Sequence, residues 1–314
     1  MKYRRLGRSG LKVSEISLGS WLTYGKSVEE NTAVKTIHKA YELGINFFDS
    51  ANVYERGEGE RVMAEALKIF PRESYIITSK AFWPVGEGPN DKGLSRKHVY
   101  EQVHKSLKNM KLDYLDIFYC HRYDPETPVD ETLRVIDDLI RQGKILYAGV
   151  SEWTAAQIEE AVGVADKYLL DRIVVNQPQY NMLHRYIEKE VIPVSSKHGI
   201  SQVVFSPLAQ GVLTGKYTSG NIPSGSRAAN EEINRFVKDY LNEDVLSKVK
   251  QLEGLSKELD TTLPALAIAW VLRQPNVASA LVGASRPDQI EANVQGSSLE
   301  LSEDVIEQIE EIIA

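Results

Sequence analysis

Four residues in this sequence have the types and positions needed to donate a proton to a carbonyl oxygen. Asp49, Lys80 and His121 each stand at the end of a short β-rich apolar run, and Tyr54 follows Asp49 closely. A tyrosine hydroxyl titrates near pH ~10, so it keeps its proton at neutral pH. A nearby ammonium lowers that pKa, a carboxylate fixes the ammonium, and a histidine can orient the substrate or relay the proton. The set reads as a general acid, and because none of these groups attacks carbon, it needs a separate hydride donor.

Each of these residues also has a simpler structural explanation. Asp49 could cap the loop or helix that follows it, and Tyr54 could be a core tyrosine whose hydroxyl is satisfied. Lys80 could be a solvated strand-end lysine, and His121 could be a hydrogen-bonded turn residue. The chemical interpretation depends on all four side chains reaching one place.

Two other chemistries remain open for the same segment. Lys80 could form a Schiff base, as in a class I aldolase, and borohydride trapping of a carbonyl substrate would then label it. Cys120, His121 and Asp124 lie close enough in sequence to share a metal, but there is no second cluster of ligands. We therefore expect no metal site.

The elements that would bring the four residues together are short strands that alternate with amphipathic helices. β-rich apolar runs occur at residues 16–18, 46–48, 75–78, 115–119, 145–150, 172–176, 202–205 and 279–282. Helical spacing of apolar residues occurs at 29–43, 60–68, 95–110, 130–141, 154–167 and 187–197. Eight strands alternating with helices predict an α/β fold, the (β/α)8 TIM barrel. In such a barrel the loops after all eight strands meet at one mouth, where Asp49, Tyr54, Lys80 and His121 would lie.

The main alternative fold is an open doubly wound sheet. That fold usually carries Gly-x-Gly-x-x-Gly after its first strand, whereas here the first strand runs into Leu18-Gly19-Ser20-Trp21. Two segments stand outside the repeat: residues 3–13 predict a β-hairpin at the barrel floor, and residues 303–313 predict an extra C-terminal helix. We expect one barrel domain over residues 1–314.

Helix ends are marked by ordinary capping residues. Ser95 and Thr154 stand where N-caps belong, and Gly44 and Gly143 follow helical runs at the position that needs a positive φ.

Composition limits the partners. The chain has 314 residues and a net charge of −7, which gives no electrostatic reason to expect nucleic acid or an anionic membrane surface. Cys120 is the one cysteine, so no intrachain disulfide is possible and a reducing compartment is expected. The first residues lack the apolar stretch of a secretory signal, and the longest apolar run, 263–272, is about half a membrane span. We expect a cytoplasmic protein with no membrane partner.

Several ordered motifs resemble the aldo-keto reductase superfamily. They are the run from Asp49 to Tyr54 (Asp-Ser-Ala-Asn-Val-Tyr) followed by Gly57 and Glu60, and Lys80 and His121 after two further strands. Residues 1–14, leading into 18–21, also fit. Within that superfamily the chain is similar to the branch that contains the β subunits of voltage-gated potassium channels, and the matches are 93–98, 124–128 and 206–217.

The resemblance implies a barrel that binds NADP(H) without a Rossmann domain and passes hydride to an aldehyde or ketone. Tyr54 would be the proton donor, Lys80 with Asp49 would lower its pKa, and His121 would orient the substrate. Channel β subunits usually carry Asn where this chain has His121, which is a departure toward ordinary reductases. The alternative function is a cofactor-sensing regulatory or scaffold subunit with little turnover. Against it, we expect no N-terminal extension that could plug a channel. Relatives in this branch include tetramers, so a homo-oligomer is a further expectation.

The resemblance also implies the cofactor contacts. Ser151 and Gln177 match positions that hydrogen-bond the nicotinamide carboxamide. Phe205 matches the position of an aromatic residue that stacks on the nicotinamide ring. Arg286 is suited to bind a 2′-phosphate. The full set of cofactor positions is Gly19, Ser20, Trp21, Asp49, Ser151, Gln177, Phe205, Ser206, Pro207, Leu208, Ala209, Gln210, Gly211, Lys216, Arg227, Gly283, Ser285, Arg286, Gln289 and Asn293.

The predicted substrate pocket lies over the nicotinamide and would take a small carbonyl compound. Its walls would be Trp21, Tyr54, Trp83, His121 and Tyr123, which favours an apolar or aromatic-tolerant aldehyde site. Two departures from relatives concern the cofactor: Glu152 stands where relatives often have Asn or Arg, and Ala292 replaces their Glu before Asn293.

Overall fold

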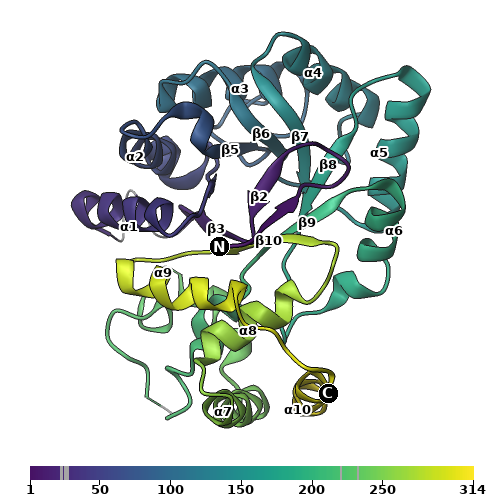
Figure 1. Cartoon of the computed structure of the whole chain (residues 1–314). Helices are drawn as coiled ribbons and strands as arrows, with labels where there is room; N and C mark the ends of the chain where they lie inside the picture. The colour runs from purple at the N-terminus through teal and green to yellow at the C-terminus, as the bar shows by residue number, and fades with distance from the viewer. Residues whose placement is uncertain (22–23, 25–27, 220, 232) are drawn as a thin grey trace.

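Eight parallel strands close into a barrel in the structure, a computed structural model that describes residues 1–21, 24, 28–219, 221–231 and 233–314 (Figure 1). The strands are β3 (Ile16–Gly19), β4 (Phe47–Asp49), β5 (Ile76–Ala81), β6 (Leu115–Cys120), β7 (Ile145–Ser151), β8 (Ile173–Gln177), β9 (Ser201–Phe205) and β10 (Val277–Val282). Each strand pairs with its neighbours in chain order, and β10 also pairs with β3. The predicted TIM barrel is confirmed, and the open sheet is excluded.

Helices surround the barrel and follow one another around it in chain order (Figure 1). They are α1 (Glu30–Glu42), α2 (Glu58–Leu67), α3 (Arg96–Met110), α4 (Val129–Arg141), α5 (Ala155–Tyr168), α6 (Val191–His198), α7 (Glu243–Glu258), α8 (Leu263–Leu272) and α9 (Pro287–Val294). In α4 the buried Val129, Leu133 and Ile136 recur at helical spacing and face the barrel. The longest apolar run of the sequence is α8, which is buried almost all round.

The predicted helix ends are confirmed at four positions. The Ser95 hydroxyl accepts the backbone N–H of His98 at 3.3 Å. Thr154 forms a capping box with Gln157, in which each side chain accepts the other residue's backbone N–H. Gly44 and Gly143 have φ values of 87° and 66°, a region that glycine enters without steric cost.

An antiparallel hairpin covers the floor of the barrel, as predicted. It consists of β1 (Tyr3–Arg5) and β2 (Lys12–Ser14). Leu6 and Val13 of this segment are fully buried among inward-facing barrel side chains, including Phe47. The backbone N–H of Gly7 donates to the hydroxyl of Ser201 at the start of β9, which places the hairpin at the amino ends of the strands.

The predicted C-terminal helix is α10 (Glu303–Ile313). Its Glu310 accepts the indole N–H of Trp270 in α8 and guanidinium N–H groups of Arg185 and Arg273.

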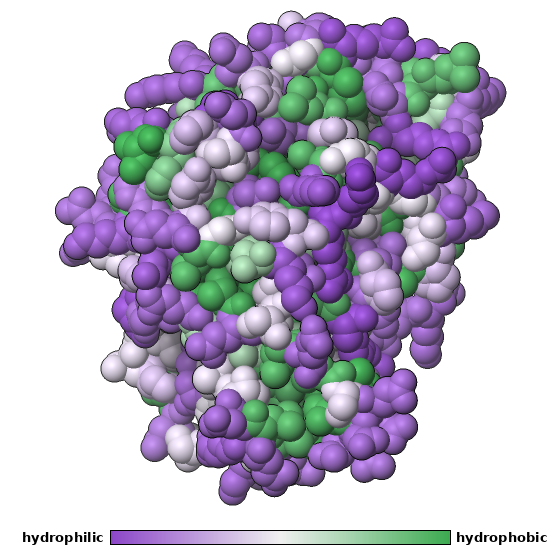
Figure 2. All heavy atoms as spheres, viewed as in Figure 1, coloured by the Kyte–Doolittle hydropathy of each residue, from purple (hydrophilic) through white to green (hydrophobic). Residues whose placement is uncertain are grey.

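The face shown in Figure 2 is mostly hydrophilic, with apolar side chains in small separate groups.

Some boundaries differ from the sequence prediction. The helix expected at 187–197 is divided into a 3-10 turn at Tyr186–Glu188 and helix α6. Further 3-10 turns lie at Tyr54–Gly57, Arg72–Ser74, Ala209–Thr214, Arg227–Ala229, Asn234–Phe236, Lys238–Tyr240 and Gln295–Ser297. Within the described residues, none of the helices is both long and apolar enough to span a bilayer.

Candidate active site

Residues at alternate strand positions point into the barrel, and this alternation brings the predicted catalytic groups together. Phe47 and Ile76 lie in the core cluster inside the barrel, so Asp49, Thr78 and Lys80 on the same two strands also face inward. In β4 and β5, Asp49 pairs with Thr78 in register. The strand ends therefore carry polar side chains on the interior side of the barrel mouth.

Lys80 and Asp49 form a buried ion pair beneath this mouth. The Lys80 Nζ donates to Asp49 Oδ2 at 2.5 Å and to the backbone carbonyl of Ser50 at 2.8 Å. Lys80 is fully buried and Asp49 is 1% exposed. The other carboxylate oxygen, Asp49 Oδ1, accepts Thr78 Oγ1 at 2.7 Å and Gln177 Nε2 at 3.0 Å. Because a buried charge costs least when it is paired and hydrogen-bonded, this arrangement holds both groups in place.

Tyr54 and His121 stand above that pair at the mouth. The Tyr54 hydroxyl lies 3.5 Å from His121 Nε2. Lys80 Nζ lies 5.2 Å from the centre of the Tyr54 ring. The structure thus brings all four predicted catalytic residues together, with Asp49 and Lys80 below and Tyr54 and His121 facing each other.

The protonation states follow from burial and neighbouring charges. Burial raises the pKa of Tyr54 well above its ordinary value; Asp49 adds to this, while the positive charge of Arg122 opposes it. Burial lowers the pKa of Lys80, although Asp49 counteracts the shift. Burial, Lys80 and Arg122 lower the pKa of His121 well below its ordinary value. At neutral pH the Tyr54 phenol is therefore protonated and the His121 imidazole is neutral.

The direction for Tyr54 is opposite to the lowering predicted from the sequence. That prediction gave Asp49 only the role of holding the Lys80 ammonium and did not include the burial of the Tyr54 hydroxyl. In the structure the ammonium is bound by Asp49, whose negative charge also acts on Tyr54, and burial disfavours the phenolate. The Tyr54 hydroxyl therefore keeps its proton at neutral pH.

A Schiff base at Lys80 does not fit this geometry. Its ammonium has no exposed surface and is bound by Asp49 and Ser50. A nucleophilic amine must be neutral and reachable by the substrate.

A cleft of about 1690 Å³ opens at the barrel mouth and is lined by most of the predicted site residues. These are Gly19, Trp21, Asp49, Tyr54, Trp83, His121, Ser151, Gln177, Phe205, Ser206, Pro207, Leu208, Gln210, Gly211, Lys216, Arg227, Gly283, Ser285, Arg286, Gln289 and Asn293. Lys80 lies beneath the cleft, and Ser20 and Ala209 are buried behind its wall.

Tyr123 lies outside the lining of this cleft. Its hydroxyl donates to Glu160 at 3.0 Å, and its ring packs against Trp153 with centroids 5.0 Å apart. Trp83 does reach the cleft and lies near His121, with ring centroids 6.3 Å apart. Trp21 packs edge-on against Phe236 at 5.0 Å.

The loops after β9 and β10 form the other end of the cleft. Gln289 Oε1 accepts both the backbone N–H and the hydroxyl of Ser285, at 2.8 and 3.2 Å. Arg286 is exposed and pairs with Asp288, whereas Arg227 donates to Gln210. Positive groups and backbone N–H donors therefore collect where a phosphate-bearing ligand could lie.

Unusual backbone conformations gather at the same mouth. Ser206, Ala209 and Gln210 have φ values of 53°, 45° and 58°, and Glu55 and Arg56 beside Tyr54 have 46° and 56°. Non-glycine residues enter this region at a steric cost, and such residues cluster at ligand sites. Successive N–H groups in left-handed turns can converge on an anion.

Three residues that support the site were not assigned a role from the sequence. Thr78 bonds Asp49, and its position two residues before Lys80 on the same strand could have indicated this. Glu60 is fully buried and accepts Ser79 Oγ at 2.5 Å and Asn109 Nδ2 at 2.7 Å, behind the strand that carries Lys80. The third residue, Arg122, gave no signal beyond its place after His121.

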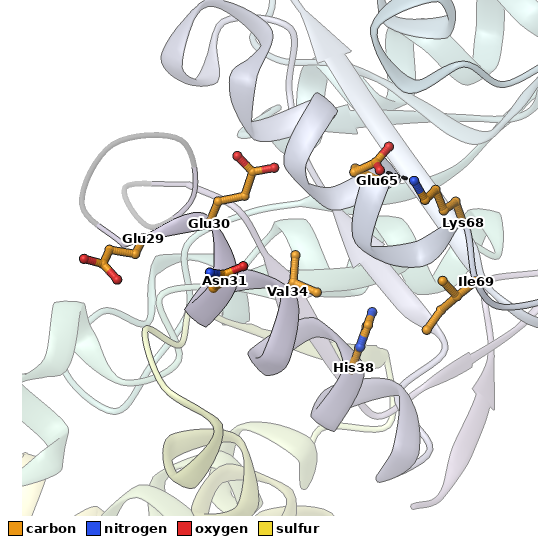
Figure 3. A pocket seen from close by; sticks show the side chains of 8 residues that line it. All are labelled: Glu29, Glu30, Asn31, Val34, His38, Glu65, Lys68 and Ile69. Atoms are coloured by element: carbon orange, nitrogen blue, oxygen red, sulfur yellow. Dashed lines mark hydrogen bonds and ion pairs between the residues drawn. The ribbon is translucent and has the colours of Figure 1, made fainter.

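A second hollow, of about 640 Å³, lies between α1 and α2 (Figure 3). Glu29 and Glu30 stand at one side, and Glu65 with its partner Lys68 at the other. It contains none of the predicted site residues. Over the described part of the chain, no group of three or more His, Cys, Asp or Glu is arranged to hold a metal ion.

Comparison with known proteins agrees with this geometry. A model of the Aldo/keto reductase family matches residues 15–314. A protein from Arabidopsis thaliana named "Probable voltage-gated potassium channel subunit beta" is 44% identical over 100% of this chain and 97% of its own length. A protein of the same name from Oryza sativa subsp. japonica is 42% identical, with the same coverage. A third, from Schizosaccharomyces pombe and also named as a potassium channel subunit beta, is 41% identical over 99% of this chain and 93% of its own length.

Proposed function

This chain belongs to the aldo/keto reductase family, and we propose that it reduces aldehydes or ketones to alcohols with NADPH, with Tyr54 as the proton donor. One observation carries the proposal: the protonated hydroxyl of Tyr54 faces His121 at the cleft mouth, directly above the buried Lys80–Asp49 pair. General acids of this kind contribute roughly 10²- to 10⁴-fold to a rate.

The contacts of each side chain suggest its role in the reaction. Tyr54 holds the proton and donates it to the carbonyl oxygen as negative charge develops there. Neutral His121 lies beside the Tyr54 hydroxyl and can orient that oxygen, while Lys80, fixed by Asp49, supplies a positive charge below the ring. These groups stabilise the developing alkoxide most when their geometry is set in advance.

The cleft residues fit a dinucleotide. Phe205, at the end of β9, lines the cleft as Ser151 and Gln177 do, and its ring could stack on the nicotinamide. The left-handed turn at Ala209 and Gln210, with Lys216 and Arg227, suits the phosphates. When bound, NADPH supplies the hydride.

The choice of NADPH over NADH rests on Arg286. Its guanidinium stands at the start of α9 and is exposed in the cleft, where it could bind a 2′-phosphate with two N–H groups.

We also propose a cytoplasmic location. The one cysteine, Cys120, is fully buried and forms no disulfide, which agrees with a reducing compartment.

The names of the relatives support a second candidate function. A protein similar to potassium channel β subunits could bind the same dinucleotide and act as a cofactor-sensing regulatory or scaffold subunit, with little turnover. The filled catalytic positions Asp49, Tyr54, Lys80 and His121 favour the reductase.

Steady-state oxidation of NADPH in the presence of 4-nitrobenzaldehyde tests the proposal. We expect turnover that depends on the aldehyde and falls to the background rate in the Tyr54→Phe variant. Tight NADPH binding without turnover, across a panel of aldehydes, ketones and sugars, would instead support the regulatory subunit.

A further inference from the structure

Arg122 presents a positive charge to the reacting end of the cleft. Its Nη1 donates to the backbone carbonyl of His121 at 2.5 Å and to Ser151 Oγ at 3.3 Å. Among the described residues, no carboxylate lies within ion-pair distance of its guanidinium, which is partly exposed and lines the cleft. Its remaining N–H groups are therefore open to a bound molecule.

Three other cations at or beneath the cleft already have protein partners. Lys80 is bound by Asp49 below the mouth. Arg286 pairs with Asp288, and Arg227 donates to Gln210, both at the opposite end. Of these cations, only Arg122 lies beside His121 and also has N–H donors that no described protein group accepts.

The surroundings of Arg122 suit a flat, anionic molecule. Its guanidinium carbon lies 5.5 Å from the centre of the Trp83 ring, and that ring lies 6.3 Å from His121. A substrate whose carbonyl oxygen rests between Tyr54 and His121 would therefore have both the Trp83 ring and the Arg122 guanidinium beside it in the cleft.

We infer that Arg122 binds a carboxylate group on the substrate, so that the preferred substrates are aldehydes or ketones that are also carboxylic acids. This inference rests on the proposed reductase function and names its substrate class. Arginine matches a carboxylate with two parallel N–H donors, an interaction about twice as strong as a neutral hydrogen bond. A carbonyl compound without the anion would lose that contact.

Three carboxylates nearby bear on this inference. Glu55 and Asp239 line the cleft, but neither is paired with Arg122. Glu152 follows Ser151 and accepts the backbone N–H of Gln179 at 2.5 Å and the Tyr186 hydroxyl at 3.2 Å. Its carboxylate is thus held by neutral donors and leaves the guanidinium free.

Two benzaldehydes of nearly equal shape provide the test. 4-Carboxybenzaldehyde carries a flat anionic group where 4-nitrobenzaldehyde carries a flat neutral one. We expect the wild type to favour the carboxylate compound in kcat/KM, and Arg122→Gln to lower the ratio of the two kcat/KM values about 10- to 100-fold. Because Arg122 also acts on Tyr54, both rates can fall, and the ratio isolates the contact with the substrate.

Arg122→Lys and Arg235→Gln serve as matched controls. The lysine keeps the charge but loses the paired donors, so the ratio should fall only partly. Arg235 is an exposed cation of the same cleft, and its loss should change the ratio less than twofold if the site is specific to Arg122.

The wild type alone gives an independent measurement. The protein has a net charge of −7, so without a cationic contact to the substrate, salt should accelerate an anionic substrate by screening general repulsion. Binding at Arg122 predicts the reverse: kcat/KM for 4-carboxybenzaldehyde falls with salt, while that for 4-nitrobenzaldehyde stays constant.

The outcomes separate the two proposals. An unchanged ratio in Arg122→Gln, or acceleration of the anionic substrate by salt, overturns the carboxylate site and leaves the reductase standing. Absence of NADPH oxidation with every aldehyde overturns the reductase itself, and the substrate class with it.

Discussion

The two ends of the cleft are built in opposite ways. At the reacting end, Asp49, Thr78, Lys80 and Gln177 stand on barrel strands and already bond one another. At the far end, the groups come from the loops after β9 and β10. Strand residues are held by the sheet on both sides, whereas loop residues are held mainly by local contacts.

Local contacts occupy the donors of the loop end. Ser285 donates to Gln289, Arg286 to Asp288, and Arg227 to Gln210. A ligand with phosphates must exchange these bonds for its own, so part of its binding free energy offsets their loss. The candidate catalytic groups are thus already in place, whereas the loop groups would have to change partners when a phosphate-bearing ligand binds.

The largest effect should come from removing the proton at the reacting end. We expect Tyr54→Phe to lower kcat for carbonyl reduction by about 10²- to 10⁴-fold, because phenylalanine has no hydroxyl to give a proton to the carbonyl oxygen. NADPH affinity, measured by fluorescence titration, should stay within about twofold, since the loop end is untouched. Retained turnover would contradict the role of Tyr54.

The next effect concerns the buried support of that end. Glu60→Gln should lower the free energy of unfolding by about 1–3 kcal/mol, because Ser79 and Asn109 both donate to this carboxylate. Denaturant unfolding measures it. The matched control is Glu58→Gln: Glu58 is exposed and pairs with Arg61, so its loss should cost less than about 0.5 kcal/mol. Equal losses of unfolding free energy in Glu60→Gln and Glu58→Gln would mean that burial does not make the contacts of Glu60 more stabilising.

A smaller effect is expected at the loop end. Arg286→Ala should raise the Kd for NADPH about tenfold and that for NADH less than twofold, since only NADPH carries the 2′-phosphate. Asp288→Asn removes the carboxylate that competes for the same guanidinium and should tighten NADPH by about twofold. Isothermal titration with both nucleotides distinguishes these cases, and equal changes for NADPH and NADH would remove Arg286 from the phosphate site.

The smallest expected change is with pH. The pKa of Tyr54 lies above its ordinary ~10 and that of His121 below its ordinary ~6.5, so neither group titrates between pH 6 and 8. Carbonyl reduction should therefore vary less than about twofold over this interval. A steep decline inside it would show that a group at the reacting end titrates there, against these shifts.

The sequence predicted the barrel and the place of the four candidate catalytic residues because both follow from local patterns. The alternation of strands and helices indicates the barrel, and inward-facing residues at strand ends lie at or just beneath the mouth: Asp49 and His121 line the cleft, and Lys80 lies below it. Capping signals such as Thr154 are equally local.

Other features depend on distant parts of the chain. Asp49 lies beside Thr78 of the neighbouring strand and accepts a hydrogen bond from the Gln177 side chain. Strand register and barrel closure set these two contacts, and no local sequence pattern encodes them. The raised pKa of Tyr54 depends on how deeply the hydroxyl is buried. The Tyr123 side chain points toward Glu160 and not into the cleft. The loop sequence is compatible with both directions and does not predict which one is taken.

The hairpin beneath the barrel has a practical consequence. β1 and β2 close the floor of the barrel, and the cleft that Tyr54 lines opens at the mouth, on the opposite side. Attaching the protein to a solid support through a group at its first residues would turn the cleft toward the solution. An immobilised enzyme or a biosensor surface prepared in this way should keep the access of the free molecule.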